Sequence, residues 1–266
     1  ILNIAWDLLF VAVFHWGIAG AAYATIFAQY VSGIGILLYV LFRCRSLFPE
    51  RKDLCFDGGI LKEIAGLSSL TCLQQSVMNF GILMVQGIVN SFGATTMAAF
   101  AAAVKIDTFA YLPVQDFGNA YSTFIAQNYG AGNKERIRRG TKESFAISTA
   151  FSLVISALVF AFAAPLMQIF VSSAETAVIA SGVRYLRIEG AFYFGIGCLF
   201  LLYGYYRAIK RAEMSGVLTV ISLGIRVLLA YVLSATFLGE TGIWMAIPIG
   251  WILADLTGLL YMRKTW

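Results

Sequence analysis

Charged side chains inside long apolar stretches are the residues of this chain with the clearest capacity for chemistry. Asp107 and Asp116 lie in the apolar stretch 96–128, and Glu189 lies in the stretch 184–206. Ionisable groups are costly in hydrocarbon, which makes each one a candidate functional group. A carboxyl group in a low-dielectric cavity can bind and release a proton or a sodium ion. We therefore predict that these three acids couple to a proton or cation, with mutual ion pairing that fixes helix packing as the alternative.

Uncharged polar residues fall on one side of two consecutive apolar stretches, 64–92 and 96–128. At about 100° per residue, the polar residues of each stretch share a helix face. A polar face against lipid is unstable, so both faces should line a protein interior or a water-filled cavity. Aromatic rings nearby would attract organic cations. The predicted cavity residues are Gln75, Asn79, Gln86, Lys105, Phe109, Tyr111, Asn119 and Tyr193. Interhelical hydrogen bonding and plain helix packing are the alternatives for any one of them.

Eight apolar stretches position these residues. They are 1–14, 18–42, 64–92, 96–128, 144–171, 184–206, 214–237 and 242–262. About 20 residues in a helix cross a hydrocarbon core of about 30 Å, so every stretch except the first is long enough. Hydrophobic residues make up 60% of the chain and charged residues only 12%, which excludes an ordinary soluble domain. The sequence therefore predicts an all-α polytopic membrane protein.

Lys and Arg fall on every second loop. Of the 19 basic residues, all lie in these alternate loops or at the adjoining helix ends except Lys105, Arg184, Arg187 and Arg226. The segment 130–140 is interpreted as one of these basic loops. Positive charge resists translocation, so the basic loops are expected to be cytoplasmic. Because the charges border membrane spans and form no recognition motif, we expect contact with the lipid bilayer and no nucleic-acid partner.

An internal repeat divides the chain. The residues Gly17, Gly20, Ala24, Leu37, Leu38 and Tyr39 reappear 222 positions later as Gly239, Gly242, Ala246, Leu259, Leu260 and Tyr261. Both copies run in the same direction, which indicates a parallel repeat about an axis along the membrane normal. We predict that residues 1–42 are the last two helices of an N-terminal lobe. Residues 43–62 are then a cytoplasmic linker, and residues 63–266 form a complete C-terminal lobe of six helices.

Other functional classes fit the sequence poorly. A membrane-embedded enzyme needs a nucleophile–base pair or metal ligands, but His15 is the only histidine and zinc-type spacing is absent. No catalytic residue, metal or cofactor is therefore expected, beyond sodium or a proton as a coupling ion. A sensory receptor is a further alternative, which the parallel repeat disfavours.

Four segments resemble the multidrug and toxic compound extrusion (MATE) family of secondary exporters. They are 2–7 (LNIAWD), 20–25 (GAAYAT), 113–133 (PVQDFGNAYSTFIAQNYGAGN) and 206–210 (YRAIK). The third is similar to the family's eighth-helix signature, and the likeness covers essentially the whole chain. The resemblance implies two six-helix bundles and an antiporter that expels cationic or amphipathic compounds from a bacterial cell, driven by sodium or protons. It also implies a monomer when full length. A lipid-linked saccharide flippase of the same superfamily is the alternative.

Three departures from the family pattern bear on the coupling ion. We expect helices one to four, which carry an acidic site in many members, to lie upstream of Ile1. The seventh helix has Gln74, Gln75 and Ser76 where several sodium-coupled members carry a glutamate. The tenth has Gly195 and Gly197 in the region where those members place an aspartate. The acids predicted here therefore come from burial in the apolar stretches and not from the family pattern.

Overall fold

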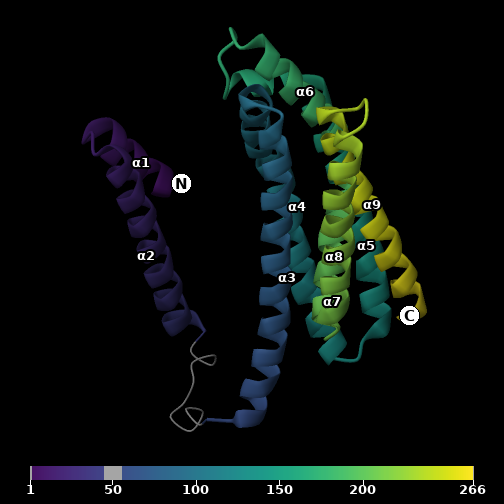
Figure 1. The fold of residues 1–266 in the computed structure, drawn as a ribbon. Helices are drawn as coiled ribbons and strands as arrows, with labels where there is room; N and C mark the ends of the chain where they lie inside the picture. The colour runs from purple at the N-terminus through teal and green to yellow at the C-terminus, as the bar shows by residue number, and fades with distance from the viewer. Residues whose placement is uncertain (1, 45–55, 266) are drawn as a thin grey trace. The chain divides into compact units, whose positions relative to one another are not determined.

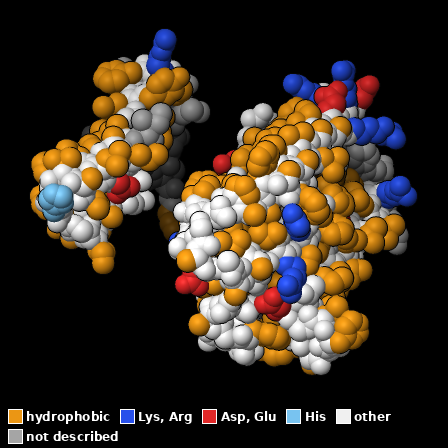
Figure 2. Space-filling view, turned by 90° about the horizontal axis from the view of Figure 1, so that it is seen from above, with side chains coloured by type: hydrophobic (Ala, Val, Ile, Leu, Met, Phe, Trp, Pro, Cys, Tyr) orange, Lys and Arg blue, Asp and Glu red, His pale blue; other side chains and the backbone are white. Residues whose placement is uncertain are grey.

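The structure is a computed structural model that describes residues 2–44 and 56–265 (Figure 1). Every regular element in this described part is a helix. Six of the described helices are long and apolar enough to cross a membrane, and the bent pair α6–α7 makes a seventh. Hydrophobic side chains cover much of the surface in the view of Figure 2. The predicted all-α, multi-pass membrane fold is confirmed.

The chain forms two compact units, Ile1–Leu61 and Lys62–Trp266. In the first unit, α1 (Leu2–Asp7) continues into the π-helical stretch η1 (Leu8–Val13), and α2 (Gly17–Arg43) follows. Aromatic rings hold these helices together. Trp6 meets Phe27 edge to face at 5.3 Å between ring centroids, and Phe10 stacks on Trp16 at 5.2 Å. The first apolar stretch is short, as predicted, and turns back onto α2.

The remaining helices of the described residues lie in the second unit, apart from the first turn of α3. They are α3 (Gly58–Ser91), α4 (Ala94–Gly130), α5 (Lys134–Gln168), α6 (Thr176–Gly190), α7 (Tyr193–Ala208), α8 (Ala212–Ser234) and α9 (Glu240–Thr265). Helix α7 is central, because α4, α5, α8 and α9 all pack against it. The largest fully buried side chains include Trp244, Tyr185 and Tyr206. The core is therefore rich in aromatic rings that carry a polar group. The hydroxyl of Tyr206 donates a hydrogen bond to the carbonyl oxygen of Gly258 at 2.6 Å.

The sixth apolar stretch is divided into two helices. Helices α6 and α7 meet at Ala191 and Phe192 and differ in direction by 52°. The sequence predicts a single span here. The bend frees backbone groups near the end of α6, and the amide of Phe192 donates to the carbonyl of Glu189 at 3.0 Å. Broken spans of this kind occur where neighbouring helices satisfy the freed groups.

The two copies of the repeat share local geometry. Gly17 and Gly239 both have positive φ, at 56° and 52°, which glycine adopts without a steric penalty. Gly20 and Gly242 each pack so closely that an added Cβ would meet a backbone oxygen, of Phe10 at 3.0 Å and of Leu233 at 2.7 Å. The repeat therefore encodes the same glycine-dependent turn and close helix crossing twice.

Two predicted loops are partly helical. Asn133 caps α5 by accepting a hydrogen bond from the amide of Arg136 at 3.1 Å, so most of the segment 130–140 is the start of a helix. Asp57 accepts in the same way from the amide of Gly59 at 2.7 Å, and α3 begins at Gly58 rather than near residue 64. The linker predicted at 43–62 therefore overlaps two helices, and its residues 45–55 lie outside the described residues.

A polar clamp joins three helices at the end of the second unit where α9 begins. The carboxylate of Glu240 accepts hydrogen bonds from Thr96 of α4 at 3.0 Å and from Ser181 of α6 at 3.1 Å. It also pairs with Arg184 of α6 at 3.1 Å. Since a hydrogen bond to a charged group contributes about 1.5–3 kcal/mol, this single side chain stabilises the α4–α6–α9 junction.

We expect Glu240→Ala to lower the melting temperature of the full-length protein, with a loss of about 2–3 kcal/mol because two hydroxyl donors and one guanidinium lose their acceptor. Thermal unfolding in detergent, followed by tryptophan fluorescence, measures the change. Glu213→Ala is the matched control, since Glu213 is the first-turn acid of α8 and is exposed. Equal melting temperatures for the two variants would show that the clamp contributes nothing to stability.

Candidate cation site

Asp107 and Glu189 form the acidic centre of the second unit. Asp107 lies in α4 and Glu189 in the last turn of α6, with exposures of only 2% and 6%. The hydroxyl of Tyr193, at the start of α7, donates a hydrogen bond to Oδ1 of Asp107. The hydroxyl of Tyr185 interacts with both carboxyl groups. One bent segment therefore presents Tyr185, Glu189 and Tyr193 to a single residue of α4.

Two acidic side chains share one basic neighbour at this site. Arg226 of α8 is half-buried and interacts electrostatically with both Asp107 and Glu189. Two carboxyl groups facing one guanidinium would leave a net charge of −1 if both were ionised. Oδ2 of Asp107 and Oε2 of Glu189 are buried and have no hydrogen-bond partner among the described residues. An uncompensated charge is costly in a low dielectric, so these two carboxyl groups are the strongest candidates for a cation site among the predicted acids.

Aromatic rings close one side of the acidic centre. Tyr185 meets Trp244 of α9 edge to face at 4.9 Å, and Trp244 stacks on Phe100 of α4 at 5.6 Å. Trp244 is completely buried. These rings exclude water from the carboxyl pair, which strengthens its electrostatic interactions. The described residues bring no trio of His, Cys, Asp or Glu together in a metal-binding geometry.

Asp116 lies apart from the other two predicted coupling acids. It is exposed, whereas Asp107 is buried on a different face of α4. The nine residues between them correspond to about 13 Å along the helix. The structure therefore brings Asp107 and Glu189 together and places Asp116 on the outer surface of the unit. The prediction treats the three acids alike because all lie in apolar stretches, whereas helical phase places Asp116 and Asp107 on different faces of α4.

The predicted cavity residues fall into two environments. Gln75, Asn79, Phe109 and Asn119 are exposed, and Gln86 and Tyr111 are half-buried. Tyr193 is the exception, because it is buried and bonded to Asp107. Tyr193 therefore belongs to the acidic centre and not to an open surface.

Lys105 is also exposed and lies in a depression beside the loop between α5 and α6. Its ammonium group is 5.7 Å from the ring centroid of Phe170. The depression has a volume of about 440 Å³, and Glu175 contributes to its lining. Lys105 and Asp107 differ by about 200° around the helix. Their opposite exposures show that these two neighbours point to different faces of α4.

We name four exposed side chains the polar faces of α3 and α4: Gln75, Asn79, Asp116 and Asn119. All four lie within helices long and apolar enough to cross a membrane. Exposed polar groups at this depth need water or another protein segment as a partner, since lipid provides none. These faces are therefore the best candidates for a substrate-facing surface.

The structure explains two departures from the sodium-coupled family members. Gln74 of α3 accepts a hydrogen bond from Ser215 of α8 at 3.1 Å and so joins two helices. At Gly197, an added Cβ would lie 2.9 Å from Oγ of Ser152 and 3.0 Å from Oγ of Ser148. A side chain at Gly197 would therefore displace the hydroxyl groups of Ser148 and Ser152 on α5. Both positions serve helix packing in this chain.

Asp255 of α9 is a second, separate buried carboxyl group, with 8% exposure. Its neighbour is the thiol of Cys198 on α7, and its Oδ1 atom has no hydrogen-bond partner among the described residues. The sequence places Asp255 inside a span but does not single it out as a site residue. Its environment differs from that of Asp107 and Glu189, because its interacting partner among the described residues is a thiol and not a basic side chain.

Sequence reasoning missed Tyr185 and Trp244, and it did not assign Arg226 to the acidic centre. The sequence does contain a pattern that points to Tyr185. Tyr185, Glu189 and Tyr193 are spaced four residues apart and would share a face of one helix. The spacing does not reveal which helix they face. Trp244 and Arg226 come from α9 and α8, and only the packing of those helices brings them to the site.

The chain is similar to several known transporters. It is 31% identical over 266 residues to the probable multidrug resistance protein YpnP of Bacillus subtilis, covering 99% of this chain and 58% of that protein. It is 28% identical to the probable multidrug resistance protein NorM of Thermotoga maritima, covering 92% of this chain and 53% of that protein. The chain thus spans a little over half the length of these curated relatives.

Solved structures share the fold. A crystal structure of a MATE protein in complex with MaL6 superposes with a TM-score of 0.90 at 25% identity, covering 99% of this chain and 60% of that one. The MatE family profile matches residues 71–232, which include Asp107, Glu189, Tyr193 and Arg226. Taken with the all-helical fold, this match shows that the chain belongs to the MatE family of membrane transporters.

Proposed function

We propose that the protein exports cationic or amphipathic compounds, including drugs, by exchanging them for protons or sodium ions. The observation that carries this proposal is the buried Asp107–Glu189 pair beside Arg226, which would have a net charge of −1 with both carboxyl groups ionised. Such a site can bind one monovalent cation and can release it when the surroundings of the carboxyl pair change. The names of YpnP and NorM as probable multidrug resistance proteins support the substrate class.

The polar faces of α3 and α4 are the proposed substrate surface. They offer amide groups from Gln75, Asn79 and Asn119, which can accept or donate hydrogen bonds to varied compounds. Asp116 adds a negative charge that attracts a cation, and the exposed ring of Phe109 can contact an apolar or cationic group. This combination suits positively charged amphipathic molecules.

Alternating access is the proposed mechanism. The acidic centre is closed to solvent, so an ion can enter or leave only if helices move. The break between α6 and α7 lies next to Glu189 and Tyr193, where a change of angle would alter the carboxyl pair directly. The parallel repeat supports two lobes that rock against each other, with one lobe supplied mainly by residues 63–266. We expect the complete protein to act as a monomer.

The proposed location is a bacterial plasma membrane with the basic helix ends in the cytoplasm. The residues Lys134, Arg136, Arg138, Arg139 and Lys142 all lie in the first three turns of α5. Lys210 lies near the same end, between α7 and α8, and pairs with Glu63 at 2.6 Å. The hydrogen bond and charge of Glu63 raise the pKa of Lys210, which keeps this positive charge in place.

A lipid-linked saccharide flippase is less well supported. A carrier of pyrophosphate-linked lipids needs basic groups along its substrate path, whereas the polar faces of α3 and α4 carry neutral amides and Asp116. Lys105 is the single basic residue within α4, Ala94–Gly130, and its ammonium group lies beside the ring of Phe170. The charge of this surface therefore favours cationic substrates.

The test uses the full-length protein in liposomes that enclose ethidium, a fluorescent cation. Efflux should follow an imposed proton or sodium gradient and should stop when the gradient is collapsed. The two gradients, applied separately, identify the coupling ion. Efflux that is the same with and without both gradients would contradict the proposal.

Asp116→Asn should separate substrate binding from ion coupling. We expect the apparent KM for ethidium to rise about 5-fold, since an exposed ion pair contributes about 1 kcal/mol or less. The maximal rate at saturating gradient should change little. Asn119→Ala, on the same exposed side of α4 but uncharged, is the control for general disturbance of this surface. An equal rise of KM in both variants would show that the charge of Asp116 plays no role.

A further inference from the structure

A groove between α5 and α9 has the chemistry of a phospholipid site. Both helices pack against α7, and the groove between them has a volume of about 570 Å³. The residues that line it are Arg138, Thr141, Lys142, Phe145, Leu256, Leu259, Leu260, Met262 and Arg263. The lining thus contains basic and apolar side chains and no acidic one. We propose that this groove binds an anionic phospholipid, with the phosphate at the basic end and an acyl chain along the apolar wall.

The order of the lining residues along the two helices supports this assignment. On α5, Arg138 and Lys142 are one turn apart on one face, and Phe145 follows toward the apolar part of the helix. Helix α9 runs the other way, so Leu256 comes first and Arg263 comes last. Seven residues separate Leu256 from Arg263, about 10 Å along the axis. Positive charge and apolar surface therefore follow the same order on both walls, which matches a headgroup above its acyl chain.

Exposure of the apolar wall requires an apolar partner. Leu256 is 52% exposed and Leu260 is 61% exposed. At the end of a membrane-spanning helix, these side chains meet lipid tails. Thr141 contributes little polarity, because its hydroxyl is bonded to the hydroxyl of Tyr121 at 2.8 Å. Basic pockets between spans at the cytoplasmic side are the positions where anionic headgroups bind.

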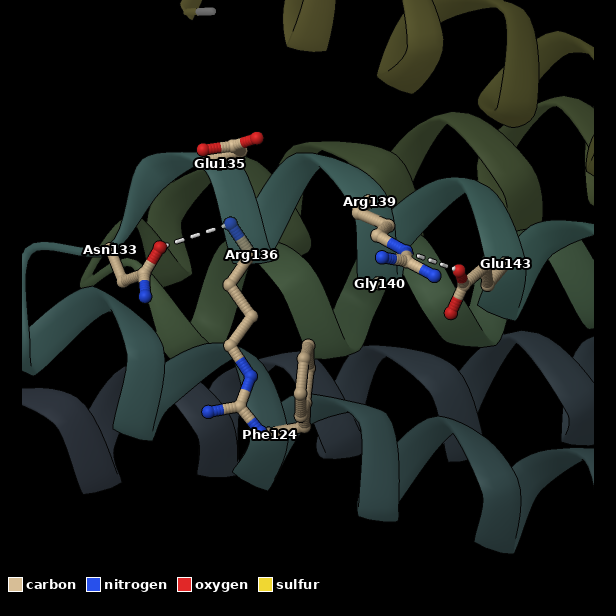
Figure 3. A pocket seen from close by; sticks show the side chains of 7 residues that line it. All are labelled: Phe124, Asn133, Glu135, Arg136, Arg139, Gly140 and Glu143. Atoms are coloured by element: carbon tan, nitrogen blue, oxygen red, sulfur yellow. Dashed lines mark hydrogen bonds and ion pairs between the residues drawn. The ribbon is translucent and has the colours of Figure 1, made fainter.

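A second pocket with basic residues, at the start of α5, differs from the groove because acidic side chains also line it (Figure 3). Its lining includes two acids, and Arg139 is bonded to one of them, Glu143, at 2.8 Å. The guanidinium of Arg136 lies over the ring of Phe124, 5.7 Å from its centroid. The positive charge of this pocket is therefore largely compensated. It lies on the same first turns of α5 and provides a matched control for general surface charge.

Native mass spectrometry of the purified full-length protein tests the proposal. Phosphatidylglycerol is added in detergent, and the fraction of lipid-bound protein is measured against lipid concentration. Lys142→Gln with Arg263→Gln should weaken binding about 10- to 30-fold, since each basic residue near an anionic headgroup contributes about one factor of five. The control pair Arg136→Gln and Arg139→Gln should change binding by less than about 3-fold. These four positions are exposed, so folding should be retained.

Two further comparisons identify the ligand as a lipid. Inorganic phosphate at concentrations equal to those of the lipid should not compete, whereas Leu256→Asn with Leu260→Asn should weaken phosphatidylglycerol binding. Equal affinity of the wild type and the Lys142/Arg263 variant would overturn the proposal. An equal loss in the control variant would also overturn it, because surface charge alone would then account for binding. Competition by inorganic phosphate would assign the groove to a soluble anion. None of these outcomes depends on transport.

Discussion

Asp107→Asn should reduce gradient-driven ethidium efflux by at least about 10-fold in the full-length protein. The replacement keeps the size of the side chain and a hydrogen-bond acceptor for Tyr193, but it removes one of the two negative charges of the acidic centre. The pair of Glu189 and Arg226 would then have no net charge, and the site would no longer attract a proton or a sodium ion. Coupling free energies of about 1–3 kcal/mol correspond to effects of about 5- to 150-fold, which sets the expected size.

Glu189→Gln should have the same effect as Asp107→Asn, and the double variant should be little worse than either single variant. Residues that hold one ion together act as a unit, so their losses do not add. Glu213→Gln is the matched control, because it neutralises an exposed carboxylate in the first turn of α8, outside the acidic centre and the polar faces of α3 and α4. Membrane abundance must be equal in all strains. Normal gradient-driven efflux by Asp107→Asn at equal abundance would remove the acidic centre from the mechanism.

Trp244 provides a second measurement of the acidic centre. Its ring contacts Tyr185, whose hydroxyl interacts with the carboxyl pair. Binding of a sodium ion or a proton should therefore change the tryptophan fluorescence of the full-length protein, and Asp107→Asn should abolish that change. Trp244→Phe identifies the part of the signal that comes from this residue. This measurement reports ion binding in the absence of transport. It therefore distinguishes a variant that has lost ion binding from one in which the helices no longer move.

Gly250→Ala should cause the largest loss of stability of any single methyl addition in this unit. An added Cβ would lie 2.4 Å from the backbone carbonyl oxygen of Ser222 on α8, and 3.3 Å from Cβ of Arg226. Backbone atoms of a helix cannot rotate away, so α8 and α9 must separate. Overpacking of this kind costs about 1–3 kcal/mol, and the gain of about 1 kcal/mol in helix propensity offsets only part of it.

Gly224→Ala is the control for this substitution. Gly224 lies on α8 itself, and an added Cβ there meets nothing within 4 Å. We expect this variant to be as stable as the wild type or slightly more stable, and Gly250→Ala to unfold at a clearly lower temperature. Gly250→Ala should also weaken coupling, because Arg226 would move away from Asp107 and Glu189. A melting temperature equal to that of Gly224→Ala would show that α8 and α9 are not in close contact at this point.

Much of the architecture was predictable because the membrane imposes strong local rules. Apolar length indicates a span, and the glycines at 17, 20, 239 and 242 encode the same turn and close crossing in both copies of the repeat. These features depend on residues close together in the chain. The bend between α6 and α7 was not predictable in this way, because the segment 184–206 contains no proline and is long enough for one continuous span. Apolar length alone does not specify where this segment breaks.

The candidate site likewise has features that the sequence determines and features that only the tertiary structure decides. Sequence alone determined that Asp107, Asp116 and Glu189 lie within spans, and that Lys105 and Asp107 must point to different faces, since helical phase is a local property. Only the tertiary structure decided that Asp107 and Glu189 meet, that Arg226 and Tyr185 join them, and that Asp116 remains outside. These relations depend on the rotation and depth at which α4, α6 and α8 pack together. Packing of that kind is set by the shapes of many side chains at once, and no short stretch of sequence specifies it.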